Sequence, residues 1–139
     1  MADGFRDFGG EPRDLTPGEE AFLQRLLVDR PPYLDVWLHT DADGRPWMLI
    51  AMDVIEGGAI RDTLRLDFDG DSIAGGWSPY FLNGDGGVRA AAANIPTGPP
   101  EGIELGSRPP AELAAAARAW FDEHYRQWPS SARRARWKL

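Results

Sequence analysis

Two clusters of alternating aspartates are the part of this sequence that most resembles a metal site. Asp67, Asp69 and Asp71 have the spacing that begins an EF-hand calcium loop, in which carboxylates at alternate positions supply oxygen ligands. The same loop needs a glycine at its sixth position and a bidentate glutamate at its twelfth. This chain has Ser72 and Ser78 there, so the match fails at two positions that the loop requires.

The second cluster fails in a similar way. Asp41, Asp43 and Gly44 are followed by Arg45, which stands where the third ligand would be. Because aspartate and glycine also favour tight turns, we interpret both clusters as hairpin turns. The chain has no cysteine, which excludes disulfides, thiol catalysis, zinc fingers and iron–sulfur clusters. We therefore expect no metal and no cofactor.

The two histidines form no metal or catalytic motif within the sequence. His124 falls on the apolar stripe of a predicted helix, where we expect it to pack. His39, at the end of a predicted strand, is the better candidate for acid–base chemistry, with Asp53 or Asp67 as its partner. No serine lies in a nucleophile elbow, and no glycine-rich run has the lysine of a phosphate-binding loop. The sequence leaves enzymatic activity uncertain and favours a protein that is not an enzyme.

One face of the predicted sheet gathers aromatic and polar side chains, and it is the constellation best suited to binding. The residues predicted to bind there are Tyr33, Trp37, His39, Trp47 and Arg65. The acids predicted on the same face are Asp35, Asp53 and Asp67. Large aromatic side chains dominate binding energies, so we expect the two tryptophans to carry most of the affinity. The alternative is that this face is covered and that the aromatic side chains form a second layer of the core.

Alternation of apolar and polar residues predicts the strands that position this face. Two strands at about 33–39 and 45–54 flank a five-residue loop, which places Trp37 opposite Trp47. A third strand precedes the turn at Asp69-Gly70, a pair typical of type I′ hairpins, with Gly70-Asp71 as the alternative turn. Either turn puts Ile73, Gly75 and Trp77 of the fourth strand on the same face as the leucines of the third strand.

Two helices flank the strands in the sequence. Thr16, Pro17 and Glu19 form an N-terminal capping box with proline at the first helical position, and Pro31-Pro32 ends this first helix. A second, longer helix is predicted from Pro109 or Pro110 to about Trp128. A helical turn is also predicted at 88–93.

These elements predict an α+β fold with an N-terminal helix, a four-stranded antiparallel β-meander and a long C-terminal helix. A fifth, edge strand is predicted where Ala135, Trp137 and Leu139 alternate with basic residues. Residues 1–14 are polar and contain glycine, and we expect a flexible N-terminal segment there. Residues 15–139 are expected to form a single α+β domain that ends in a basic tail at 129–139.

The charge distribution bears on the class of partner. The net charge is −7, but the tail carries four basic residues and no acid, so the rest of the chain carries −11. This balance argues against nucleic acid and favours a partner protein, with a basic one the best match, or a second copy of the chain. No secretory signal and no apolar run of membrane-spanning length is present, so we expect a cytoplasmic protein with no membrane partner.

We therefore expect a small acidic, non-enzymatic protein-binding domain, comparable in size and charge with antitoxin, immunity and chaperone proteins. That comparison is an analogy and rests on no shared motif. The alternative is a small-molecule-binding protein or enzyme that uses the aromatic face around Trp37, His39 and Trp47.

Overall fold

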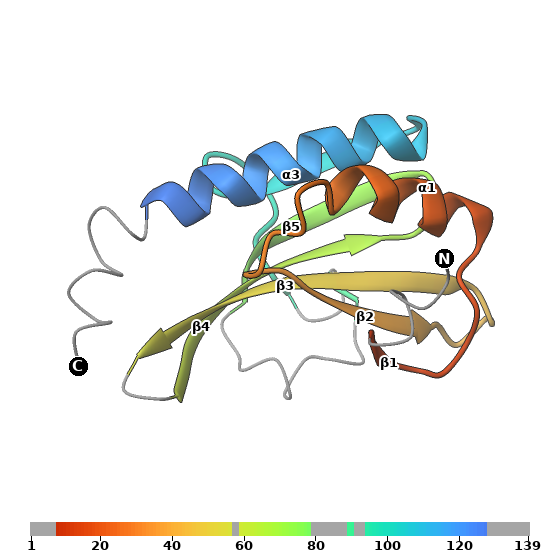
Figure 1. Cartoon of the computed structure of the whole chain (residues 1–139), viewed down its shortest axis with the longest axis horizontal. Coiled ribbons are helices and arrows are strands. Elements are labelled where there is room, and N and C mark those ends of the chain that lie inside the picture. Colours follow the sequence, from red (N-terminus) through yellow and green to blue (C-terminus); the bar gives the residue numbers. More distant parts are fainter. Residues whose placement is uncertain (1–7, 57–58, 79–88, 91–93, 128–139) are drawn as a thin grey trace.

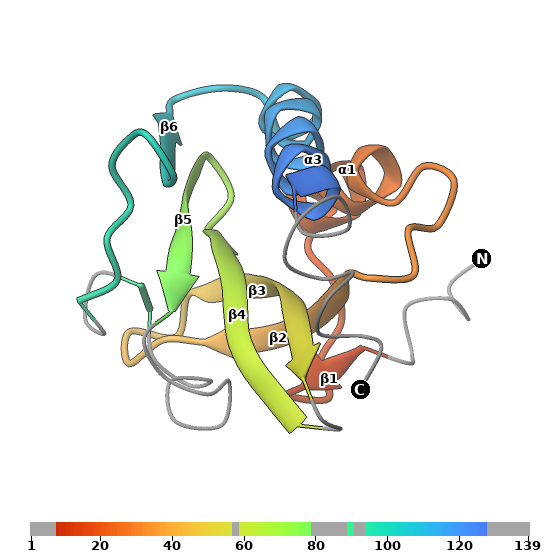
Figure 2. The same cartoon turned by 90° about the vertical axis from the view of Figure 1, so that its left-hand side faces the viewer.

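A computed structural model describes residues 8–56, 59–78, 89–90 and 94–127 of the chain. Its elements in chain order are β1 (Gly9–Gly10), α1 (Pro17–Leu26), β2 (Asp35–Thr40), β3 (Pro46–Glu56), β4 (Ala59–Phe68), β5 (Ser72–Ser78), β6 (Ile103–Gly106) and α3 (Pro110–Gln127). The strands form one sheet in the order in which they occur in the chain. Both helices lie over the same face of this sheet, as Figures 1 and 2 show. The predicted α+β class is confirmed.

Both helices start at the local signals that were predicted. At the start of α1, the Thr16 hydroxyl accepts a bond from the Glu19 backbone N–H (3.0 Å), and the Glu19 carboxylate accepts one from the Thr16 N–H (2.9 Å). The end of α1 differs from the prediction: the helix stops at Leu26, before Pro31-Pro32, and the chain then turns through Asp29 and Arg30, both with positive φ. The long helix α3 begins at Pro110, one of the two predicted positions.

The main core lies between the helices and the sheet. Phe22 of α1 stacks on Phe68 of β4 with ring centroids 4.1 Å apart, and Phe121 of α3 is fully buried. The sheet residues buried in this core are Val36, Leu38, Met48, Ile50, Met52, Leu64, Leu66, Phe68 and Ile73. These side chains alternate along each strand, so the face that the sequence assigned to the core is the one that the helices cover.

The sheet has six strands in the described residues, not the four that we predicted. β1 pairs in parallel with β2, and β6 pairs antiparallel with β5. β1 consists of Gly9 and Gly10, which have no side chains to show a pattern. A β-carbon on Gly9 would overlap the ring of Trp37, so this close pairing requires glycine. The predicted strand at 135–139 lies outside the described residues, and the predicted turn at 88–93 lies mostly outside them.

The predicted pairing of Trp37 with Trp47 is wrong by two residues. Trp37 lies opposite Leu49, and His39 lies opposite Trp47. The register is set by the loop, because one carboxylate oxygen of Asp41 accepts the backbone N–H groups of Asp43 (2.9 Å) and Arg45 (3.0 Å). A shift of two residues leaves every side chain on its predicted face.

The turn between β4 and β5 is the alternative that the sequence allowed. Phe68 pairs with Ile73, which leaves Gly70 and Asp71 as the central residues. Gly70 has a φ of 115°, as a type II′ turn needs at its first central position. The carboxylate of Asp69 accepts the Ser72 N–H at 3.0 Å and so fixes the turn. The type I′ turn at Asp69-Gly70 is therefore not formed.

The other face of the sheet is covered in part by the segment that follows β5. A β-carbon on Gly76 would overlap the carbonyl oxygen of Pro96 and lie 3.5 Å from the Ile95 side chain. Ile95 is itself buried. The backbone of this segment therefore lies directly against β5, on the side away from the helices.

We predict that Gly76→Ala destabilises the protein, because its methyl group has no space beneath the Pro96 carbonyl. Overpacking of this kind costs about 1–3 kcal/mol or more of the free energy of unfolding. The matched control is Gly98→Ala, since a β-carbon there meets nothing within 4 Å. Urea unfolding should show a change of at most about 1 kcal/mol for the control, and that change should be stabilising. Equal stabilities for the two variants would contradict the close contact.

Candidate functional site

The candidate site is the sheet face turned away from the helices, which we call the polar face. Its described side chains on β2, β3 and β4 are Asp35, Trp37, His39, Trp47, Leu49, Ala51, Asp53, Thr63, Arg65 and Asp67. The strand register orders them in rows, with Trp37 opposite Leu49 and Leu49 opposite Asp67. In a neighbouring row, His39 lies opposite Trp47.

A buried ion pair lies at the centre of the polar face. The Arg65 guanidinium donates to the Asp67 carboxylate at 2.6 Å, and the two side chains are 0% and 2% exposed. The second carboxylate oxygen of Asp67 accepts the backbone N–H of Ala90, also at 2.6 Å. Both oxygens of Asp67 are therefore bonded within the protein. Such a pair is costly to break, because removal of either partner leaves an uncompensated buried charge.

Arg89 lies over this pair and over Trp47. Its guanidinium carbon is 5.2 Å from the centre of the Trp47 ring, within the range of a cation–π contact. Its Nε lies 3.4 Å from Asp67 Oδ2, and its Nη2 lies 3.3 Å from Asp69 Oδ2. Beneath it Trp47 is only 1% exposed. Trp47 therefore belongs to a small second core with Leu49 and Ala51. For this residue the structure agrees with the alternative prediction, in which the face is covered and its aromatic side chains form a second layer of the core.

The strip of Trp37 and His39 along β2 is a partly accessible region of the polar face. Trp37 and His39 are both half-buried, two residues apart on the same side of the strand. The His39 ring stacks on Trp47 with ring centroids 4.6 Å apart. Trp37 Nε1 and His39 Nε2 are buried atoms that make no hydrogen bond to any described residue. Buried polar nitrogens are nearly always bonded in native proteins, so these two atoms mark the strip as unusual.

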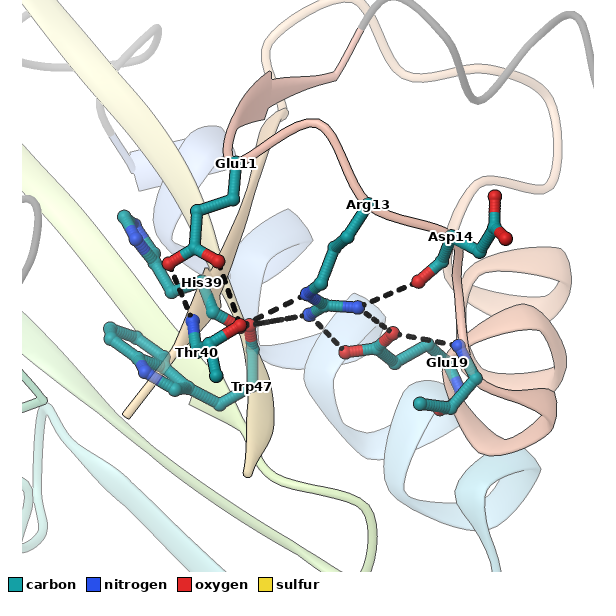
Figure 3. A network of polar contacts seen from close by, with 8 residues as sticks. Glu11, Arg13, Asp14, Glu19, His39, Thr40 and Trp47 are labelled. Atoms are coloured by element: carbon teal, nitrogen blue, oxygen red, sulfur yellow. Dashed lines mark hydrogen bonds and ion pairs between the residues drawn. The ribbon is translucent and has the colours of Figure 1, made fainter. Parts of the chain in front are cut away.

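Arg13 fixes the end of β2 that carries this strip (Figure 3). Its guanidinium donates to the backbone carbonyl of His39 (3.0 and 3.2 Å) and to that of Trp47 (3.1 Å). The same group makes a two-bond ion pair with Glu19, with both bonds at 2.8 Å. The N-terminal capping box of α1 is therefore tied directly to the row that holds the two stacked rings.

Glu11 adds a second contact at the same end of β2. Its carboxylate accepts the Thr40 N–H at 3.0 Å and the Thr40 hydroxyl at 2.7 Å. We expected residues 1–14 to form a flexible segment. The described part of that segment, residues 8–14, contains strand β1 and the contacts that Glu11 and Arg13 make with the end of β2. Sequence patterns did not indicate the role of Arg13, because its partners lie up to 34 positions away along the chain.

Tyr33 does not lie on the polar face. Its ring stacks on Tyr125 of α3 at 4.0 Å, and its hydroxyl bonds to Asp122. The prediction extended the strand alternation to Tyr33, whereas β2 begins only at Asp35. His124 packs as expected: it is buried, lies against Trp77 and Trp120, and contacts the Glu101 carbonyl at 3.0 Å.

Two acids lie near the start of β2. Asp53 accepts a bond from the Thr63 hydroxyl at 2.8 Å. The pKa of Asp35 is raised by burial and, to a smaller degree, by the negative charge of Asp53. The structure thus brings together on one face every predicted site residue except Tyr33.

Comparison with protein-family models found no match, and comparisons with curated proteins and with solved structures found none either. Within the described ranges no group of three or more histidine, aspartate or glutamate side chains is placed to hold a metal ion. None of the helices described is long and apolar enough to cross a membrane.

We predict that Trp47→Ala lowers the free energy of unfolding by about 3–5 kcal/mol, as loss of a fully buried aromatic side chain does. The matched control is Trp37→Ala, which removes the same side chain from a half-buried position and should cost less. Chemical denaturation of both variants measures the difference. A stability loss at Trp47 no larger than that at Trp37 would contradict its place in a second core.

We predict that His39 makes the protein less stable as the pH falls. Burial lowers the pKa of His39 from its ordinary value of 6.5; the charges of Arg65 and Arg13 act in the same direction, and Glu11 and Asp67 oppose them. The folded state therefore binds the proton more weakly than the unfolded state, so the contribution is present above about pH 6.5 and is lost below it.

The measurement is the melting temperature of the wild type and of His39→Gln between pH 7.5 and 5. The wild type should lose more stability over this range than the variant, because the variant has no imidazole to protonate. Parallel curves would contradict the lowered pKa of His39.

Proposed function

We propose that this chain is a small non-enzymatic binding domain for a partner protein, and that the β2 strip of Trp37 and His39 recognises the partner. The observation that carries this proposal is the pair of ring nitrogens without a hydrogen-bond partner among the described residues. A partner that supplies carbonyl or carboxylate oxygens gives both rings, once they turn outward, bonds that none of the described residues supplies. That difference favours the bound state.

The surroundings of His39 support binding rather than catalysis. A histidine that acts as a general base is commonly oriented by a carboxylate that is free to accept its other ring N–H. Asp67 has both oxygens engaged, by Arg65 and by the Ala90 N–H, and Arg65 is fully buried. Asp67, one of the two acids predicted to assist His39, is therefore already engaged in holding the polar face together.

The spacing of the strip suits an extended peptide segment. Trp37 and His39 are two residues apart on one strand, which corresponds to about 6.6 Å. Carbonyl groups that point to the same side of an extended partner chain repeat at the same interval. The net charge of −11 outside the basic tail favours a partner with basic residues around this segment and disfavours a second copy of the chain.

A small ligand with two acceptor atoms is the alternative, because the same two nitrogens would serve it. Trp47 would then support the His39 ring from within the protein, since it stacks on that ring and is itself buried beneath the Arg89 guanidinium. The two cases differ in whether the binding partner that stays with the purified protein is another protein or a small molecule.

The test is affinity capture from native lysate with wild-type protein, Trp37→Ala and Trp120→Phe as baits. Truncation of an aromatic residue at the centre of an interface typically costs 2 kcal/mol or more, so binding to Trp37→Ala should weaken about 30-fold. Trp120→Phe is the control, since it also removes an indole N–H, here one bonded to the Glu101 carbonyl on the helix side. Circular dichroism checks that all three baits are folded.

The outcomes separate the two functions. A protein captured by the wild type and by Trp120→Phe but not by Trp37→Ala supports the proposal. A small molecule seen by native mass spectrometry in wild-type protein and absent from Trp37→Ala supports the alternative. Capture that does not depend on Trp37 contradicts both.

A further inference from the structure

Strand β3 extends past the strand beside it. β2 pairs with β3 only from Pro46 to Ala51, whereas β3 continues to Glu56. On its other side β3 stays paired with β4 as far as Glu56. Figure 1 shows this end of the β3–β4 hairpin reaching beyond the rest of the sheet. Among the described residues, the β2-side edge of 52–56 has no neighbouring strand, and such an edge is a template for one more strand.

The side chains at this edge alternate in character. Met52 and Val54 point to the helix side and are 2% and 3% exposed. Asp53 lies between them on the polar face, near Asp35 at the start of β2. Neither Asp35 nor Asp53 makes an ion pair with a basic side chain in the described ranges, and burial and mutual repulsion raise the pKa of Asp35. The edge therefore suits a strand that is basic on one side and apolar on the other.

The C-terminal segment of this chain has that pattern. Arg134, Arg136 and Lys138 alternate with Ala135, Trp137 and Leu139, and the segment contains no acid. Its apolar and basic side chains alternate every second residue, as the side chains along the β3 edge do. Its charge also complements the rest of the chain, which is strongly negative.

The end of α3 lies close to this edge. Tyr125, two residues before the end of α3, stacks on Tyr33, two residues before the start of β2. Asp35, the first residue of β2, pairs with Ala51, so the unpaired stretch of β3 begins at the next residue. Residues 128–139 can span about 40 Å when extended, which is ample to reach it.

We propose that residues 133–139 dock on residues 52–56 of β3 as an added edge strand of the same molecule. Arg134, Arg136 and Lys138 then face Asp35 and Asp53, while Trp137 packs on the helix side near Val54. The segment continues the line of β2 along β3. This docking is independent of the proposed partner site, which lies on β2.

The first test uses engineered cysteine pairs, which are unambiguous because the natural chain has no cysteine. Asp53→Cys is combined in turn with Arg134→Cys, Arg136→Cys, Lys138→Cys, Ala135→Cys and Leu139→Cys. Neighbouring strands bring only side chains of one face within disulfide distance. At least one of the three basic positions should cross-link within the molecule, and the two apolar positions should not.

Matched controls use Asp43→Cys, in the loop at the opposite end of the sheet, with the same five partners. None of these pairs should cross-link. Failure of all three basic positions to cross-link with Asp53→Cys would overturn the docking, and so would cross-linking through the apolar positions alone. Disulfide-linked dimers would show that a second copy occupies the edge, which would overturn the intramolecular arrangement.

The second test removes the segment. Truncation after Trp128 should lower the melting temperature by several degrees. The difference between full-length and truncated protein should shrink in 1 M salt, because the ion pairs lie near the surface. Equal melting temperatures in low salt would overturn the proposal. If the truncated chain does not fold, the cysteine pairs still decide.

Discussion

The Arg13 guanidinium is the contact on which the placement of the other elements depends most. It bonds Glu19, which also caps α1, and it bonds the backbone carbonyls of two neighbouring strands. Glu19 is only 2% exposed, so its charge would be costly to bury without this partner. The planar guanidinium fork can bond a carboxylate and several carbonyls at once, which a lysine cannot do. One side chain thus fixes the start of a helix relative to the end of the sheet that carries the candidate site.

Local signals in the sequence predicted much of this fold. The capping box at Thr16 and Glu19 and the proline at the start of α3 act within one helical turn, so their effect does not depend on the rest of the chain. The two faces of the sheet could also be predicted, because alternation along a strand requires no knowledge of its neighbours. The polar face therefore emerged with all of its predicted members except Tyr33, which precedes the strand.

What the sequence could not show depends on distant contacts. The β2–β3 register follows from the bonds that the Asp41 carboxylate makes within its own loop. The alternation of apolar and polar residues does not decide the register, because two placements of a loop of the same length satisfy it equally well. The burial of Trp47 depends on Arg89, which lies far away along the chain in a segment where the sequence predicted only a helical turn. A half-exposed aromatic strip and a buried aromatic layer have the same alternation, and only the covering residues distinguish Trp37 from Trp47.

The order of the sheet also has a consequence for the way in which the chain folds. The four central strands are joined by hairpins, so their pairing closes short loops and can form early. Both outer strands pair across long stretches of chain: Gly9 with Trp37, and Gly106 with Ser72. The meander must therefore exist for a time with two open edges. During that interval the nascent sheet is most exposed to aggregation, and the later pairing of two very short strands reduces this exposure.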